Sequence, residues 1–245
     1  MVIIKSDDEI ATMRRCGRIL AAILDKLRME IRPGLKTARL DVIVAEESER
    51  RGVIPSFKNY RGFPANLCVS VNDEVVHGIP GERILREGDI VSLDVGAKLD
   101  GFHTDAAVTI GVGRINKEAE ELIAVTEASL KAGIAQARSG ARVDDISSAI
   151  QNYVESRGFS VVREYTGHGI GRDLHEDPQI PNFVVGKGPA LRKGMTLAIE
   201  PMVNAGDWRT KLAGNGWTVL TADGSLSAHF EHTIAIIDSE PEILV

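Results

Sequence analysis

Cysteine is scarce in this chain of 245 residues, where Cys16 and Cys68 are the only two. Two cysteines cannot supply the disulfide framework of a small secreted domain, and their separation does not fit the paired cysteines of a structural zinc site. This scarcity favours a reducing compartment, and we therefore expect a cytoplasmic protein.

Long apolar runs and basic blocks are lacking as well. No run approaches the roughly 18 apolar residues of a membrane-spanning helix, and the opening MVIIKSDDEI turns acidic too early for a signal peptide. The net charge of -6 is spread along the chain without a basic cluster. We accordingly expect no membrane partner, no nucleic-acid specificity and, since nothing requires an assembly, a monomer.

Amphipathic periodicity predicts four helices. Ser6 and Glu9 form a capping box at the start of the first, which runs to the break at Pro33 and Gly34. The other three are expected at 38–52, from 116 to about 138, and at 143–158.

Short runs rich in β-branched residues accompany these helices and predict strands. They occupy 67–71, 89–96, 102–110, 196–203 and 232–238. The chain is therefore expected to be of mixed class, α/β or α+β, with one sizeable core.

An internal repeat relates the two parts of the chain. At an offset of 106 residues, REGDIVSLD aligns with RKGMTLAIE, so Asp94 coincides with Glu200. At an offset of 126, FHTDAAVTI aligns with AHFEHTIAI, so Asp105 coincides with Glu231 after an insertion of 20 residues. This pattern predicts a duplicated, pseudo-two-fold fold with its site where the halves, about 1–112 and 113–245, join.

Two aspartates lie inside apolar strand segments, where an unpaired charge costs several kcal/mol. A two-residue turn at Asp100 and Gly101 would place Asp94 opposite Ala107, with Asp105 two positions along on the same face. A turn one residue earlier would place the two aspartates directly opposite each other. In either register, two carboxylates on one apolar face require a cation between them.

Glu200 and Glu231 add two more acids from the second half of the repeat. Four carboxylates with one histidine form an oxygen-rich site suited to two divalent ions, unlike a structural zinc site. The histidine candidate is His168 in YTGHGIGRDLHEDP, with His77 and His175 as further candidates. The glycines around His168 miss both nucleotide-binding spacings, so a phosphate cradle is disfavoured.

Five segments together resemble the type I methionine aminopeptidases and cover nearly the whole chain in that family's order. They are SVNDEVVHGIP, SLDVGAKLDGFHTDAAVT, GHGIGRDLHEDP, LAIEP and SAHFEHT. The resemblance implies a single catalytic domain, 1–245, with the pita-bread fold: pseudo-two-fold duplicated halves and a curved antiparallel sheet flanked by helices. It also implies metal-dependent removal of the N-terminal methionine from nascent proteins and peptides, with a small second residue preferred and the ribosome as a candidate setting.

The resemblance also assigns residues to the site. Two divalent metal ions, of cobalt, manganese, iron or zinc, would be held at the family's motif positions by Asp94, Asp105, His168, Glu200 and Glu231. The substrate-contacting histidines would be His77 and His175, and the methionine pocket would be lined by Tyr60, Phe63, Cys68 and Trp217. Leu174 departs from the family pattern, since many relatives carry a bulkier aromatic residue there.

Such a site gives three residues catalytic roles. Glu200 would take a proton from the attacking water and pass it to the leaving amine. His175 would stabilise the oxyanion or orient the backbone of the second residue, and His77 would hydrogen-bond the scissile amide region. The acidic cluster would attract the free α-amino group of a peptide, which explains an action on N-termini.

The insertion at about 206–227 contains both tryptophans, Trp208 and Trp217. It is either a plain surface hairpin or a wall of the substrate pocket, because large aromatics on a loop beside a site often shape a pocket. The resemblance selects Trp217 for the pocket.

Three other functions fit parts of this pattern. Proline-specific peptidases share the fold, but they normally carry a large additional N-terminal domain. A non-catalytic binding module of the same fold would be expected to have lost metal ligands, and all five are present. A dinuclear phosphoesterase would be expected to show more histidines and basic phosphate contacts near the acids.

Overall fold

The computed structural model describes residues 1–186, 188–238 and 240–245. These residues contain four α-helices at the predicted places, namely α1 (Asp7–Glu30), α2 (Thr37–Arg51), α3 (Lys117–Ile134) and α4 (Val143–Glu155). The capping box at Ser6 and Glu9 is present at the start of α1. Gly52 ends α2 in the left-handed conformation with φ 70°, as a glycine at that position favours.

Helix α3 is shorter than predicted. It ends at Ile134 rather than near Arg138, because the chain tightens into a turn in which Gln136 N–H donates to Gly133 O at 3.0 Å and Ala137 N–H to Ile134 O at 2.9 Å. Such three-residue spacing is a common way for a helix to end.

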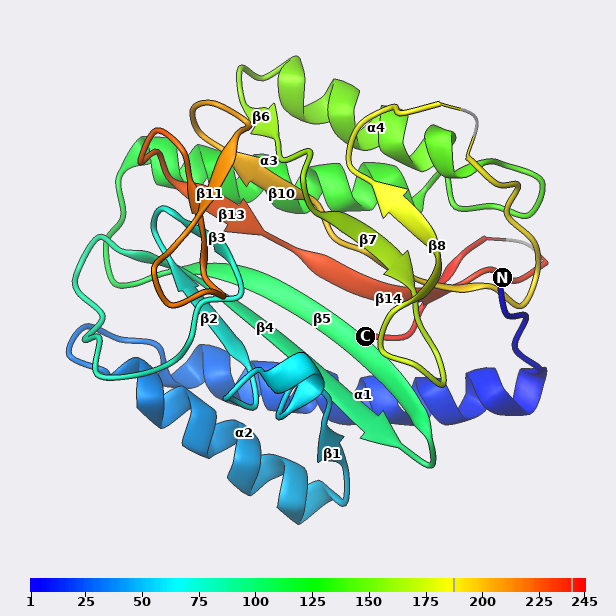
Figure 1. Cartoon of the computed structure of the whole chain (residues 1–245), viewed down its shortest axis with the longest axis horizontal. Helices are drawn as coiled ribbons and strands as arrows, with labels where there is room; N and C mark the ends of the chain where they lie inside the picture. Colours follow the sequence, from blue (N-terminus) through cyan, green and yellow to red (C-terminus); the bar gives the residue numbers. More distant parts are fainter. Residues whose placement is uncertain (187, 239) are drawn as a thin grey trace.

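One large antiparallel sheet forms the centre of the fold (Figure 1). Its main path runs β1 (Ile54–Pro55), β4 (Ile90–Leu99), β5 (Phe102–Gly111), β14 (Glu231–Ala235), β9 (Thr196–Ile199), β7 (Thr166–Gly169) and β8 (Glu176–Pro181). Strand β2 (Cys68–Val71) pairs with β4, and β15 (Glu242–Ile243) pairs with β14.

Two small sheets complete the strand structure of the described residues. One contains β13 (Ser227–His229), β10 (Met202–Asn204) and β6 (Ser160–Val161). The other contains β11 (Thr210–Leu212), β12 (Val219–Thr221) and β3 (Glu74–Val76), and a short 3-10 helix, η1 (Tyr60–Gly62), precedes β2.

The strand order shows the expected pseudo-two-fold arrangement. The β4–β5 pair follows α1 and α2 in the chain, and the β9–β14 pair follows α3 and α4, while β5 and β14 pair with each other in the middle. Thr233 on β14 links the two strands at this junction. Its hydroxyl donates to Asp105 O at 2.7 Å and accepts from Asp105 N–H at 2.8 Å. Asp94 and Asp105 thus lie on one side of the junction and Glu200 and Glu231 on the other.

The predicted strand at 196–203 is wrong, because the chain forms two strands there. Strand β9 belongs to the large sheet and β10 to a small one, with a break at Glu200 and Pro201. Proline lacks the N–H that a ladder needs, and Asn182 Nδ2 donates to Glu200 O at 3.0 Å at the break. Phe230 makes a similar break between β13 and β14, so both glutamates lie where the chain passes from one sheet to another.

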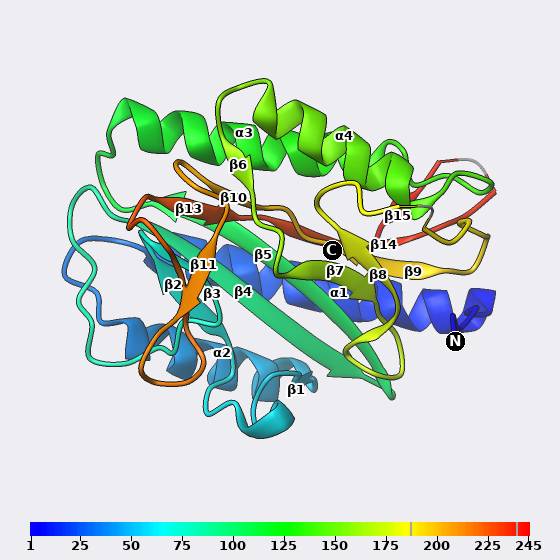
Figure 2. The same ribbon diagram turned by 45° about the horizontal axis from the view of Figure 1, so that its top comes forward.

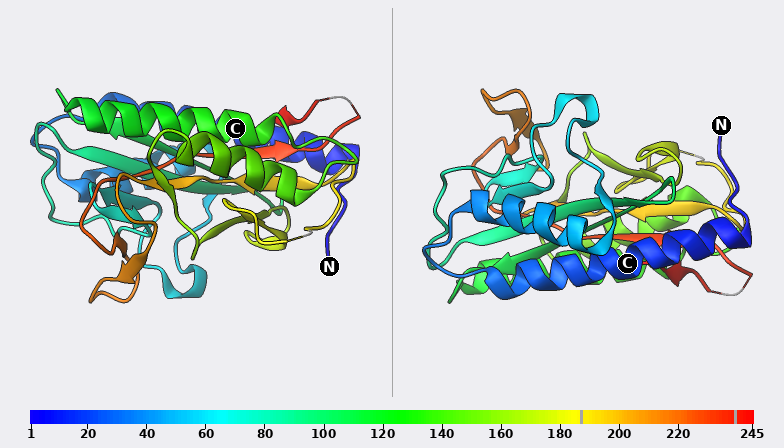
Figure 3. Two further views of the ribbon diagram at one scale, coloured as in Figure 1. Left: turned by 90° about the horizontal axis from the view of Figure 1, so that it is seen from above. Right: turned by 90° about the horizontal axis from the view of Figure 1, so that it is seen from below.

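The helices cover one face of the large sheet, whereas η1 and the β11–β12 hairpin project from the other (Figures 2 and 3). The main core lies under the helices and includes Leu20, Leu27, Leu93 and Leu122, each fully buried. None of the helices in the described ranges combines the length and apolar character needed to cross a membrane. The face opposite the helices is therefore the one that can present a site.

Candidate metal centre and substrate cavity

The β4–β5 hairpin sets the positions of the two aspartates. Leu99 pairs with Phe102, so the turn residues are Asp100 and Gly101, and their φ values of 49° and 88° are typical of a tight hairpin turn. Asp94 consequently lies opposite Ala107. This confirms the first of the two predicted registers and excludes the shifted one.

Ala107 also pairs with Glu231 of β14 on its other side. Asp94, Ala107 and Glu231 therefore form one row across three strands, with the small Ala107 side chain between the two acidic residues. Asp105 lies two residues from Ala107 on the same strand and so points to the same face.

His168 comes from β7 on the far side of this row. Its Nδ1 lies 2.8 Å from Gly169 O, which makes Nδ1–H the donor and leaves the Nε2 lone pair free. Nε2 lies 3.4 Å from Glu200 Oε1. The ring is thus held in the orientation that a metal-ligating histidine requires.

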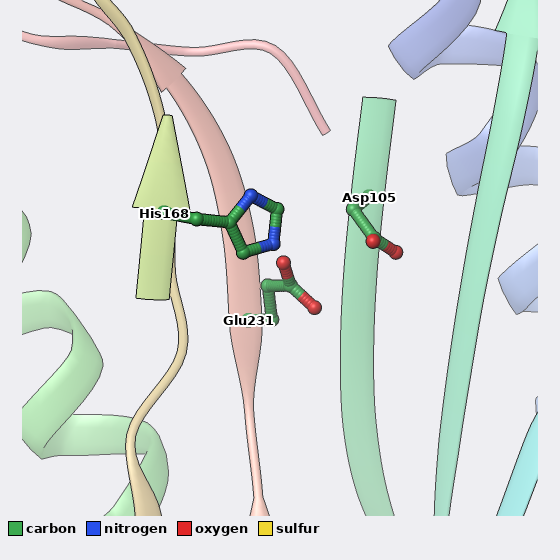
Figure 4. Close-up of side chains that lie close together, drawn as sticks. All are labelled: Asp105, His168 and Glu231. Atoms are coloured by element: carbon green, nitrogen blue, oxygen red, sulfur yellow. The ribbon is translucent and has the colours of Figure 1, made fainter. Parts of the chain in front are cut away.

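Asp105, His168 and Glu231 converge from β5, β7 and β14 (Figure 4). One potential ligand atom from each lies within 4.8 Å of the other two, and all three residues are buried. Glu200 joins them through its contact with His168, and its side chain is 14% exposed. Asp94 reaches the cluster from β4 through the row described above, so the five predicted ligands share one location.

The cluster is electrostatically unfavourable without a cation. Burial raises the pKa of Asp94 to about 7. Burial, followed by the charges of neighbouring carboxylates, raises the pKa of Asp105, Glu200 and Glu231 well above their ordinary range. Among the described residues, Asp94 Oδ1 and Glu231 Oε1 are buried with no hydrogen-bond partner. Such unpaired oxygens are costly. A bound cation would satisfy them, because each oxygen could serve as a metal ligand.

A cavity of about 150 Å³ opens onto the acid cluster. This volume is well above the 10–15 Å³ or so that one water needs. All the residues predicted for the site line this one cavity: Tyr60, Phe63, Cys68, His77, Asp94, Asp105, His168, His175, Glu200, Trp217 and Glu231. Leu174 lines it as well.

The two other predicted histidines flank the cluster. The ring centroid of His175 lies 4.2 Å from that of His168, and His175 Nδ1 lies 2.9 Å from Tyr60 Oη. His77 has φ 58°, which is unusual for a non-glycine residue and common at functional sites. Burial lowers the pKa of His175 to about 3 and also lowers that of His77, so both rings are neutral near pH 7.

The apolar end of the cavity contains Phe63 and Trp217, whose rings meet edge to face at 5.2 Å and 77°. Trp217 lies between β11 and β12, in the insertion that breaks the repeat. Trp208, in contrast, has the guanidinium groups of Arg163 and Arg209 over its ring, each at 5.0 Å. The insertion is therefore a hairpin that also contributes one tryptophan to the cavity wall.

A model of metallopeptidase family M24 matches residues 11–238. The methionine aminopeptidase of Clostridium perfringens is 55% identical over 245 residues, which cover 100% of this chain and 98% of that protein. The chain belongs to metallopeptidase family M24, among its methionine aminopeptidases. Methionine aminopeptidase 1 of Bacillus subtilis is 53% identical over 245 residues, with 100% and 99% of the two chains covered.

Solved structures confirm the pita-bread fold of this M24 metallopeptidase. The methionine aminopeptidase of Thermotoga maritima superposes with a TM-score of 0.98 at 49% identity, covering 100% of this chain and 99% of that one. The prolidase of Pyrococcus furiosus gives a TM-score of 0.82 at 21% identity and is covered over 65% of its length. The prolidase shares the fold alone, so the proline-specific alternative is not favoured.

The donor set of the M24 chain fits divalent metal ions. Carboxylate oxygens with one imidazole nitrogen suit hard or borderline divalent cations, and the buried oxygens without partners supply the free lone pairs. The Nδ1 contact of His168 leaves Nε2 available, as ligation requires. These features together support the binding of divalent metal ions at this cluster.

Sequence reasoning missed three residues near the site. Phe57 and Arg61 line the cavity, and Arg61 has an unusual φ of 51°. His229 Nε2 lies 3.7 Å from Glu200 Oε2 and is buried without a hydrogen-bond partner among the described residues. His229 and Glu231 are two residues apart, a spacing that could have placed both on one face, whereas no local pattern distinguishes Phe57 or Arg61.

Proposed function

We propose that this M24 chain removes the N-terminal methionine from nascent proteins and peptides, with a small second residue preferred. One observation carries the proposal. A buried cluster of carboxylates suited to bind cations and a pocket with aromatic side chains line the same cavity. Identities of 55% and 53% to methionine aminopeptidases over the full chain support it.

The proposed cofactors are two divalent metal ions, of cobalt, manganese, iron or zinc. Asp94, Asp105, His168, Glu200 and Glu231 would hold them. When bound, such ions lower the pKa of water and polarise a carbonyl group. Five potential ligand residues around one cavity, four of them carboxylates, support two ions rather than one.

Glu200 is the proposed base. Its carboxylate faces the cavity beside His168, and its partial exposure of 14% leaves it accessible to water. It would accept a proton from the attacking water and pass it to the leaving amine. A single carboxylate can serve both steps because the two proton transfers occur in sequence.

The two neutral histidines would act on the peptide itself. His175, oriented by Tyr60 Oη at 2.9 Å, would donate to the oxyanion or position the backbone of the second residue. His77 would hydrogen-bond the scissile amide region. Both rings remain neutral near pH 7, so each can donate or accept without carrying a charge.

The remaining contacts determine which peptides are bound. Phe63 and Trp217 offer aromatic faces and edges to a thioether, a contact that contributes about 0.3–1.5 kcal/mol, and Tyr60 and Cys68 would complete the pocket. The acid cluster would attract the cationic α-amino group. A peptide with a free N-terminal methionine satisfies both requirements at once.

We further propose that residues 1–245 act as one catalytic domain with halves at about 1–112 and 113–245. The protein is proposed to be monomeric and cytoplasmic, and to meet its substrates as nascent chains, with the ribosome as a candidate setting.

A substrate panel tests this function. The protein, supplied with Mn²⁺, is assayed on Met-Ala-Ser, N-acetyl-Met-Ala-Ser, a proline dipeptide and an aryl phosphate, and each product is measured chromatographically. We expect rapid release of methionine from Met-Ala-Ser alone, because only that peptide has a free α-amino group and fits the pocket. Preferred cleavage of the proline dipeptide or the phosphate would contradict the proposal.

A further inference from the structure

The segment that links β7 to β8 carries His175 at its end. On one side, His103 N–H of β5 donates to Gly171 O at 2.7 Å. On the other, Glu176 begins β8 and pairs with Gly169 of β7. His175 is therefore located between two fixed points of the sheet, directly before Glu176, and its Nδ1 lies 2.9 Å from Tyr60 Oη.

Lys5 reaches this segment from the residues before α1. Its ammonium donates a hydrogen bond to the Glu176 carboxylate, and each of these side chains is only 2% exposed. The backbone N–H of Lys5 donates to Gly194 O at 2.8 Å. Both the backbone and the ammonium of Lys5 are thus fixed, and the Glu176 carboxylate is held with them.

The space for this ion pair depends on Gly171. A Cβ at position 171 would lie 2.3 Å from Lys5 Cε and 2.8 Å from Glu176 Oε1. Both side chains are buried, so neither could move aside without losing its contact. The glycine lets the segment pass directly over the pair.

We propose that Lys5 is a positioning residue for His175. The inference rests on the proposed function, because it assigns Lys5 a part in that reaction. The Glu176 carboxylate is directed at Lys5, whereas the side chain of the preceding residue, His175, lines the cavity. Without the ammonium, the buried carboxylate would lose its counter-charge and keep only the Asp173 N–H as a donor, at 3.3 Å. A buried charge without a counter-charge is unfavourable enough to move the segment toward water, and His175 would move with it.

A second ion pair on the same segment provides a matched control. Arg172 Nη2 lies 2.7 Å from Glu9 Oε1, with side chains 61% and 26% exposed. Exposed pairs of this kind contribute little to structure. Glu9→Gln removes this charge pair while retaining an acceptor for the capping box, and it should leave kcat/KM for Met-Ala-Ser within twofold of the unaltered enzyme.

The test measures kcat and KM for Met-Ala-Ser in the metal-loaded Lys5→Met enzyme. We expect kcat/KM to fall at least tenfold, chiefly through kcat. In a His175→Ala background, Lys5→Met should change kcat/KM less than twofold, because Lys5 acts through the ring that has been removed. Equal losses in the two backgrounds, or no loss in the first, would overturn the proposal.

A second readout does not depend on activity. The His175 resonance in protein labelled with ¹³C at histidine Cε1, assigned with the His175→Ala variant, should shift in Lys5→Met and stay in place in Glu9→Gln. An unmoved resonance in Lys5→Met would overturn the proposal. An unaltered enzyme that is inactive on Met-Ala-Ser would instead overturn the proposed function, and a shifted resonance would still show that Lys5 positions His175.

Folding of the variants is checked by circular dichroism and thermal unfolding. If Lys5→Met does not fold, Glu176→Gln and Gly171→Ala take its place, since the first weakens the pair without removing the acceptor and the second displaces it with a methyl group. Both should then show the same loss of kcat/KM and the same dependence on His175. A kcat/KM in both variants equal to that of the unaltered enzyme would contradict the proposal.

Discussion

The acid cluster determines how the stability of the metal-free protein depends on pH. The ordinary pKa values of its carboxyls are 3.8 for Asp105 and 4.5 for Glu200 and Glu231, and burial raises all three pKa values well above them in the folded protein. Between the unfolded and folded values, the folded state binds more protons than the unfolded state. The free energy of unfolding of the metal-free protein therefore falls as pH rises through that window.

The magnitude follows from the number of protons retained. One carboxyl that stays protonated in the folded state gives a slope of about -1.4 kcal/mol per pH unit. Over the 1.5 pH units from 7 to 8.5, each proton that the folded cluster retains lowers the free energy of unfolding by about 2 kcal/mol. For a chain of this length, that corresponds to a decrease of roughly 4–8 °C in Tm.

Urea unfolding, followed by the fluorescence of Trp208 and Trp217, measures this effect. The protein is freed of metal by chelation and studied at pH 7, 7.75 and 8.5, alone and with saturating Mn²⁺. With metal, the carboxylates are ionised in both states and the slope should disappear. Glu231→Gln, also metal-free, removes one titrating group and should make the slope shallower. Stability of the metal-free protein that is flat or rises over this range would refute the reasoning.

Two substitutions test the proposed catalytic base and the proposed methionine pocket separately. Glu200→Gln keeps the volume of the side chain and removes its basicity, so kcat should fall by at least ~10² with an unchanged circular dichroism spectrum; near-normal kcat would place the base elsewhere. Trp217→Ala should lower kcat/KM for Met-Ala-Ser about tenfold or more, or about 1.4 kcal/mol, and weaken discrimination against leucine. Trp208→Ala is its control, and equal Met-to-Leu ratios in the two variants would show that Trp217 does not form the pocket.

The hairpin that carries the two aspartates was predictable to within one residue. Asp100 and Gly101 favour a two-residue turn, and a turn fixes every pair along both strands because side chains alternate with a period of two. The register of Asp94 opposite Ala107 was one of the two that the sequence allowed, and the structure selects it. The repeat predicted equally well that Glu200 and Glu231 would meet these aspartates, since related halves place equivalent residues about a shared axis.

Other features were not predictable from local pattern. The apolar run at 196–203 reads as one strand, although Pro201 was a signal that it would break. The contact of Lys5 with Glu176 joins residues 171 positions apart, and no periodicity in either segment indicates it. Such contacts arise from the packing of whole elements, which only the folded chain defines.

Metal dependence is the central claim, and methionine release by metal-free protein tests it most directly. The protein is stripped with a chelator, its metal content is measured, and free methionine from Met-Ala-Ser is followed as Co²⁺, Mn²⁺ or Fe²⁺ is added. We expect no methionine release from the stripped protein and full recovery with metal, because the buried carboxylates need a cation and the attacking water needs activation. Full activity in protein shown to contain no metal would contradict the account.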